Sequence, residues 1–216
     1  MKTILCYGDS NTWGYMPKIG QRYEPDVRWT GVLSAHLGKD YRVVEEGLNG
    51  RTTVFDDPHD DFRNGKSTLG MCVISQKPLD WVVLMLGSND LKFADAVGAA
   101  RGANVLVRML THADAAFAVS APIFPNGANI LLVSPILFHE DFDNSPFRSV
   151  FRYSYPESLK FAKEFKAVAD LQGVHFLDAA KYASPSPVDG LHMEADSHQK
   201  LGEAIAAYIL AHDSAK

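Results

Sequence analysis

Three residues from the two ends of the chain could form a serine nucleophile and the groups that activate it. Ser10 comes directly after Gly8 and Asp9, at the end of a short apolar run. A serine hydroxyl is a poor nucleophile without a base and an orienting partner. Asp189 and His192 lie three residues apart, and a carboxylate and an imidazole supply these two functions. The combination indicates attack of a serine on a carbonyl carbon.

Two further motifs offer hydrogen-bond donors for the negative charge that such an attack creates. Gly47 and Gly50 lie in a turn after the second apolar run, and backbone N–H groups at glycines are unshielded by side chains. Asn89 follows the third apolar run and carries a side-chain amide. Donors of both kinds build oxyanion holes. Taken alone, each motif is at least as well explained as an ordinary turn or helix cap.

The motifs follow apolar runs that predict β-strands over residues 2–7, 42–46, 81–86, 129–134 and 174–178. Several runs are continuous, as in strands covered on both faces. Helical patterns are expected between them over 27–37, 94–113, 156–171 and 195–212. This alternation predicts an α/β fold with a mainly parallel five-stranded sheet and helices on both faces. The carboxyl edge of such a sheet, where ligand sites form, would gather all four motifs.

Three long segments fall outside the alternation. Residues 15–26 are polar and broken by prolines, residues 55–66 are acidic, and residues 138–155 are rich in aromatic side chains. Long segments of this kind in a compact domain are usually functional or interfacial. We expect the three to frame a pocket, to contact other subunits, or both.

Composition and charge limit the partners of the chain. With 216 residues, 46% hydrophobic and 22% charged, we expect one soluble domain spanning residues 1–216. A net charge of −5 without a basic patch argues against nucleic acid, and no apolar stretch approaches the ~20 residues of a membrane span. The N-terminal residues lack the pattern of a signal peptide, which favours a cytoplasmic location. Cys6 and Cys72 lie in apolar runs and are expected to be inert packing residues.

In their order along the chain, the four motifs resemble the SGNH hydrolases, also called the GDSL esterase/lipase family. The four residue types that name the family are matched by Ser10, Gly50, Asn89 and His192. The block around the nucleophile reads Gly-Asp-Ser-Asn, so that Asn11 stands where the family's other name has Leu. The resemblance extends over essentially the whole chain.

The resemblance implies a flavodoxin-like three-layer α/β/α fold and a serine esterase mechanism. Ser10 would attack an ester carbonyl, His192 would accept the serine proton, and Asp189 would orient the imidazole. The backbone N–H groups of Ser10 and Gly50, with the amide of Asn89, would hold the oxyanion.

The same resemblance makes Asp9, Asn11 and Trp13 the candidate substrate-binding residues. Asp9 is better explained as an organiser of the turn that carries the nucleophile. Trp13 is explained equally well by packing beneath that turn.

The stretches 6–14 and 45–53 look most like bacterial arylesterases and acyltransferases of this family, and related proteins deacetylate sugars. This implies hydrolysis of small acyl esters, acetyl above all, such as aryl acetates or acetylated sugars. Acyl transfer and perhydrolysis are further reactions of the same kind. No cofactor and no metal are implied. The arylesterase relatives form compact homo-oligomers, often octamers, and the aromatic segment 138–155 fits such an interface.

Three alternatives stay open at this point. A flavodoxin-like binding module would use the same sheet, although no glycine-rich phosphate loop follows the first strand. A metal-dependent phosphoesterase would use the acidic segment, where the possible ligands are Asp56, Asp57, His59, Asp60 and Asp61. Their spacing matches no defined ligand pattern, and a dense acidic loop is usually a solvated surface. A non-catalytic carbohydrate-binding relative of the family is the third alternative.

Overall fold

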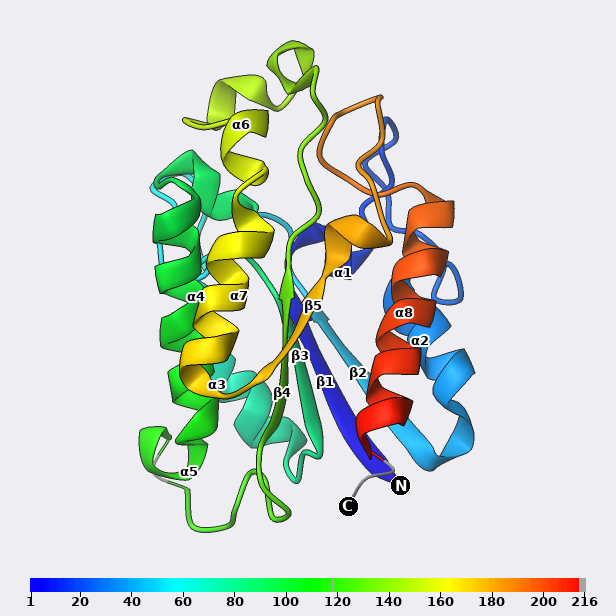
Figure 1. The fold of residues 1–216 in the computed structure, drawn as a ribbon, viewed down its shortest axis with the longest axis vertical. Helices are drawn as coiled ribbons and strands as arrows, with labels where there is room; N and C mark the ends of the chain where they lie inside the picture. The colour runs from blue at the N-terminus through cyan, green and yellow to red at the C-terminus, as the bar shows by residue number, and fades with distance from the viewer. Residues whose placement is uncertain (118, 214–216) are drawn as a thin grey trace.

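Five parallel strands form one sheet in the computed structural model, which describes residues 1–117 and 119–213. The strands are β1 (Lys2–Gly8), β2 (Tyr41–Gly47), β3 (Trp81–Met85), β4 (Asn129–Ser134) and β5 (His175–Asp178). They lie in the order β2-β1-β3-β4-β5, and each neighbouring pair is parallel (Figure 1). This is the flavodoxin-like strand order. Ligands of such sheets bind at the carboxyl ends of the strands, at the point between β1 and β3 where the strand order reverses.

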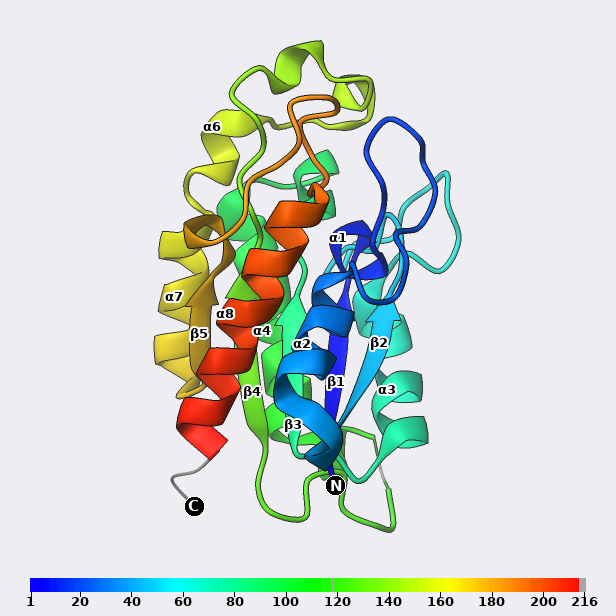
Figure 2. The same cartoon turned by 90° about the vertical axis from the view of Figure 1, so that its right-hand side faces the viewer.

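Helices cover both faces of the sheet, so the expected three-layer fold is confirmed (Figure 1, Figure 2). Helices α2 (Trp29–Leu37) and α8 (Ala195–Asp213) pack on one face. On the other face lie α3 (Gly65–Gln76), α4 (Ala96–Thr111) and α7 (Phe161–Gln172). The shorter helices are α1 (Ser10–Trp13), α5 (Ala113–Ala116) and α6 (Tyr155–Ser158). Within the described residues, no helix has both the length and the apolar character needed to cross a membrane.

Each face of the sheet has its own apolar core. Side chains alternate along β1, so Ile4 and Cys6 pack with α2 and α8, whereas Leu5 and Tyr7 pack toward the other three long helices. Both cysteines are buried and free, and burial raises the pKa of both thiols, that of Cys72 to about 12. The two cores hold β1 in the middle of the molecule and thereby fix the place where its carboxyl end meets the site.

Helix α3 was missed by the sequence analysis, which ended the acidic loop at residue 66 and predicted no helix after it. Glycine, serine and threonine interrupt its apolar residues, so no clear helical period shows in the sequence. The buried positions Leu69, Cys72 and Val73 nevertheless have helical spacing. Asn64 caps the helix, because its side chain accepts the N–H of Lys66 at 3.0 Å.

The single helix predicted over 156–171 is wrong, because α6 ends at Ser158 and α7 begins at Phe161. Ser158 is fully buried. Its hydroxyl donates to the carbonyl of Tyr155 at 2.7 Å and accepts the N–H of Phe138 at 3.0 Å. Side-chain bonds to nearby backbone compete with regular helix, and here they also attach the helix to the aromatic segment.

The three long segments gather above the carboxyl edge of the sheet (Figure 2). In the aromatic segment, Phe138, Phe142 and Phe151 are buried and contact one another with ring centroids 4.5 to 5.5 Å apart. These rings therefore form a small core inside the segment, and they are not available for the subunit interface that the sequence suggested.

Candidate active site

Ser10 begins α1 directly after the carboxyl end of β1. Asp9 caps this helix, and its Oδ1 accepts the N–H of Asn11 at 3.0 Å. The helix passes so close to β2 that a Cβ at Gly47 would lie 2.2 Å from the backbone nitrogen of Trp13. Glycine at this position therefore lets the turn pack against the sheet. As the first residue of α1, Ser10 has a backbone N–H with no partner inside the helix.

The Ser10 hydroxyl is joined to His192 and Asp189 through two hydrogen bonds. Ser10 Oγ and His192 Nε2 are 3.0 Å apart, and His192 Nδ1 lies 2.8 Å from Asp189 Oδ2. When Nδ1–H donates to the carboxylate, Nε2 is left to accept the serine proton. All three residues are buried, with 5% or less of each exposed. The structure thus brings together the three residues that the sequence singled out, across a separation of 182 positions.

Asp189 is held by backbone groups as well as by the imidazole. Its Oδ1 accepts the N–H groups of Leu191 and His192, each at 3.0 Å. Burial acts to raise the pKa of this carboxyl, but the hydrogen bond and charge of His192 and the two backbone donors outweigh it. The pKa therefore lies below its usual value, and Asp189 is ionised at neutral pH.

Two aromatic rings hold the imidazole of His192. The Tyr15 ring stacks on it with centroids 4.0 Å apart and planes at 27°, and the Phe147 ring meets it edge-on at 5.3 Å and 78°. Tyr15 and Phe147 also contact each other, at 6.2 Å. Neither residue was predicted from the sequence to belong to the site. They come from the first and third long segments, and no spacing in the sequence links them to His192.

Gly50 and Asn89, which the sequence predicted as oxyanion donors, lie near Ser10. Gly50 has a φ of +76°, a left-handed conformation that residues with a side chain rarely adopt. The Nδ2 of Asn89 donates to the carbonyl of Arg51 at 3.3 Å. A side-chain amide has two N–H donors, and this bond uses one of them. Ser10, Gly50 and Asn89 line the same cavity.

That cavity has a volume of about 130 Å³ and opens over the serine. Besides the residues of the four motifs, apolar side chains of Phe147, Val150, Phe151 and Leu191 line it. Pockets for drug-sized ligands measure roughly 300 Å³ or more, so this cavity suits a short acyl group.

The candidate substrate-binding residues Asp9, Asn11 and Trp13 are not among the described residues that line this cavity. Both ends of the Asn11 amide are bonded to the segment that carries His192. Nδ2 donates to the carbonyl of Leu191 at 3.2 Å, and Oδ1 accepts the N–H of Met193 at 3.0 Å. Substrate contact by these three residues stays a prediction, while their described bonds organise the turn and its neighbours.

Asp9 and Asp90 are two further carboxylates buried beneath the site. Asp90 Oδ2 accepts the N–H of Thr53 at 2.9 Å, and Oδ1 accepts its hydroxyl. Burial raises the pKa of Asp90 to about 7, although both bonds from Thr53 oppose it. Burial likewise raises the pKa of Asp9 to about 6, against the N–H of Asn11 and the charges of His192 and Arg51. Both groups therefore titrate near neutral pH.

The acidic segment reaches the site through Asp57. Its Oδ2 lies 3.2 Å from the Nζ of Lys92, a residue that lines the cavity. The sequence analysis missed Lys92, although it follows Asn89 by three residues and a 3₁₀ turn aligns positions three apart. Among the described residues, no group of three or more His, Cys, Asp or Glu side chains is arranged to hold a metal ion.

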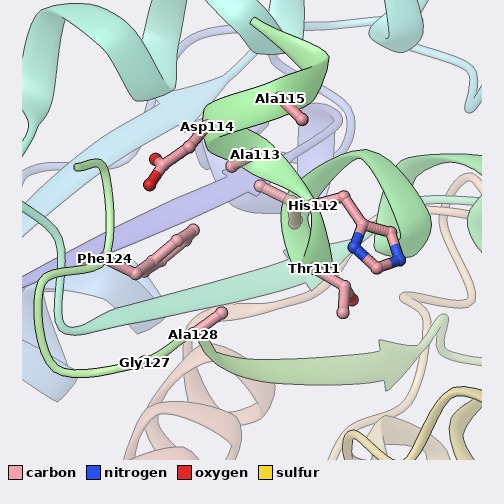
Figure 3. A pocket seen from close by; sticks show the side chains of 9 residues that line it. Thr111, His112, Ala113, Asp114, Ala115, Phe124, Gly127 and Ala128 are labelled. Carbon is pink, nitrogen blue, oxygen red and sulfur yellow. The ribbon is translucent and has the colours of Figure 1, made fainter. Parts of the chain in front are cut away.

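A second cavity, of about 330 Å³, lies at the opposite edge of the sheet. Figure 3 shows the side chains that line it. It lies between the end of α4, α5 and the chain just before β4, and Thr111, His112 and Phe124 line it. Asp114 also lines it, and its Oδ1 accepts the N–H of Ile123 at 2.8 Å. This cavity is separated from Ser10 by the length of the strands.

Known proteins are similar to this chain in sequence and in fold. The profile of the GDSL-like lipase/acylhydrolase family matches residues 6–200. The structure of the native M. smegmatis aryl esterase is 36% identical with a TM-score of 0.88, covering 98% of this chain and 99% of that chain. The structure of Est24, a carbohydrate acetylesterase from Sinorhizobium meliloti, is 34% identical with a TM-score of 0.88 and the same two coverages. A comparison with curated proteins found no match.

The family profile covers most of the chain and includes Ser10, Gly50, Asn89 and His192. Both solved structures exceed 30% identity over nearly the full length. The chain therefore belongs to the GDSL-like lipase/acylhydrolase family, a family of ester hydrolases.

Proposed function

We propose that this ester hydrolase cleaves esters of small acyl groups, acetyl above all, through an acyl-enzyme on Ser10. The observation that carries the proposal is the chain of two hydrogen bonds, 3.0 and 2.8 Å long, from Ser10 through His192 to Asp189. The cavity of about 130 Å³ over the serine supports a short acyl group.

In acylation, the Ser10 Oγ forms a bond to the carbonyl carbon while His192 Nε2 takes the hydroxyl proton. Asp189 stays ionised and stabilises the imidazolium. The imidazolium then gives its proton to the leaving alcohol as the ester C–O bond breaks. In deacylation, a water molecule gives a proton to His192 and attacks the acyl carbon. The bond from that carbon to Ser10 Oγ then breaks, and the imidazolium returns its proton to Oγ, which releases the acid and restores Ser10.

Three donors would stabilise the oxyanion of both tetrahedral intermediates. They are the backbone N–H groups of Ser10 and Gly50 and the second N–H of the Asn89 amide. Removing one such donor typically lowers turnover by about 10²–10³. The left-handed turn at Gly50 and the bond from Asn89 to Arg51 support this assignment, because both restrain donors that line the cavity.

Aryl acetates and acetylated sugars are the proposed substrates, by analogy with the M. smegmatis aryl esterase and the S. meliloti carbohydrate acetylesterase. Acyl transfer to an alcohol or to peroxide is part of the proposal, because Phe147 and Phe151 line the cavity and apolar walls would disfavour water near the acyl-enzyme. We also propose a homo-oligomer in the cytoplasm. In support, Phe62 and Met71 are 79% and 65% exposed and line one groove beside α3, as a contact surface would.

The deciding experiment compares hydrolysis of 4-nitrophenyl acetate and 4-nitrophenyl octanoate, with a chelator present. The wild type is expected to cleave the acetate at least about tenfold faster, because the octanoyl chain exceeds the cavity. Ser10→Ala is expected to lower kcat by about 10⁴ or more, whereas Ser75→Ala on α3 leaves it unchanged. Equal rates on the two esters would contradict the small-acyl proposal, and activity retained in Ser10→Ala would contradict the nucleophile.

A further inference from the structure

Lys92 brings a charge into the wall of the cavity over Ser10, in addition to the residues of the four motifs. It ends the 3₁₀ turn Asn89–Lys92, which begins with the proposed oxyanion donor Asn89. Only 13% of its side chain is exposed. A cation that is nearly removed from water is costly unless it is paired. A buried lysine in this cavity therefore requires an anionic partner, and its position suggests a role in the reaction.

The partner is Asp57, from the acidic segment. Asp57 Oδ2 lies 3.2 Å from Lys92 Nζ, and only 6% of its side chain is exposed. Its Oδ1 accepts the N–H of His59 at 3.0 Å. Burial acts to raise the pKa of Asp57, but the bonds from His59 and Lys92 outweigh it and lower the pKa. The Phe151 ring centroid lies 5.9 Å from Nζ, so the ammonium is held from two sides.

The ammonium lies next to the proposed oxyanion donors. A Cβ built on Gly50 would be 3.8 Å from Lys92 Nζ. Ser10, Gly50, Asn89 and Lys92 all line the same small cavity, so the charge is separated from the reacting carbonyl oxygen by no more than the width of that cavity. In a site shielded from water, a fixed charge acts more strongly on a developing charge than it would in solution.

We propose that Lys92 accelerates acyl transfer by stabilising, through its charge, the oxyanion that Gly50 and Asn89 bind. The proposal rests on the proposed function of this site. Asp57 keeps the ammonium in place and offsets part of its charge. If Lys92 acts through its charge, substitutions of Lys92 and of Asp57 should change kcat by different amounts. If the ion pair only holds the acidic segment in place, both substitutions should lower kcat equally.

The test measures kcat and KM on 4-nitrophenyl acetate and the affinity for phenylboronic acid, which forms an anionic tetrahedral adduct with a serine. Lys92→Met is expected to lower kcat about tenfold, or about 1.4 kcal/mol, with KM changed less than twofold. Its boronate affinity falls by a similar factor, because the adduct carries the same charge as the oxyanion. Lys92→Arg keeps most of the activity, and Asp57→Asn, which leaves the ammonium and a neutral hydrogen-bond acceptor in place, lowers kcat less than Lys92→Met does. Lys39→Met, at an exposed position before β2, is the matched control.

Two results would overturn the proposal. One is a Lys92→Met variant with unchanged kcat and boronate affinity. The other is an Asp57→Asn variant that loses as much as Lys92→Met, because the pair then acts by holding the segment. If Lys92→Met does not fold by circular dichroism, Lys92→Gln makes the same change in charge. Failure of the proposed function is distinguished by Ser10→Ala, which would then retain activity in the same assay.

Discussion

The imidazole of His192 must keep one orientation, because its two nitrogens face different partners. The bond to Asp189 restrains the ring in its own plane, and the stacked ring of Tyr15 restrains it out of that plane. The backbone N–H of Tyr15 donates to the carbonyl of Ser10 at 3.0 Å. The same residue therefore contacts the base through its ring and the nucleophile through its backbone.

Tyr15→Leu is expected to lower kcat on the acetate ester by about tenfold, because it removes the ring that restrains His192 and leaves the hydrogen bonds of the site unchanged. Tyr15→Phe keeps the stacked ring and is expected to retain kcat within about twofold. Steady-state kinetics of the two variants, with circular dichroism as a folding control, tests this. A Tyr15→Phe variant as slow as Tyr15→Leu would show that the phenol hydroxyl, not the ring, is required.

At the scale of elements, the site depends on how α1 is attached to the segment that carries His192. Asn11 makes this attachment through its bonds to Leu191 and Met193, the two residues that flank His192. All of these groups are buried. The side chain at the position after the nucleophile therefore sets the distance between the nucleophile and its base.

Asn11→Leu is expected to reduce the free energy of unfolding by about 2–6 kcal/mol, because it leaves two buried backbone groups unpaired at roughly 1–3 kcal/mol each. It also lowers kcat, since His192 lies between those two groups. Urea unfolding and acetate hydrolysis measure the two effects. Asn126→Leu, at an exposed position, makes the same change of residue type as a control. Stability equal to the wild type would show that these bonds contribute little.

Helices and strands whose apolar residues are continuous or strongly periodic could be predicted from the sequence. Elements in which polar residues interrupt the apolar pattern could not. The central strands β1, β3 and β4 were predicted because each is an apolar run between turn residues. Helix α3 was missed because small polar residues dilute its apolar face, and the break at Ser158 depends on a bond to Phe138, far away in the sequence. The triad residues had recognisable types and spacing, whereas Tyr15 enters the site only through tertiary contacts. Lys92 could be placed from its spacing to Asn89 only if the 3₁₀ turn were known.

At the scale of the whole molecule, the buried carboxyls of Asp9 and Asp90 make stability depend on pH. Asp90, after β3, accepts two bonds from Thr53 in the turn after β2, and Asp9 accepts the N–H of Asn11 in the turn after β1. Burial raises the pKa of Asp9 to about 6 and that of Asp90 to about 7, from ordinary values of 3.8. Between about pH 4 and pH 7 the native state therefore binds more protons than the unfolded state.

The contribution of Asp9 and Asp90 to the free energy of unfolding therefore decreases as the pH rises from about 4 to about 7, and it is constant above that range. Asp90→Asn removes the larger contribution, so its melting temperature is expected to fall less than that of the wild type between pH 5 and pH 8. Burial lowers the pKa of His198 to about 3, so the protein loses stability through this residue as the pH falls below 6.5. This loss is the same in the wild type and in Asp90→Asn. The difference between the two melting curves therefore reports Asp90 together with its interaction with the charge of Asp9. Asp26→Asn, at an exposed position, is the control, and an Asp90→Asn curve parallel to the wild type would contradict the titration of Asp90 in this range.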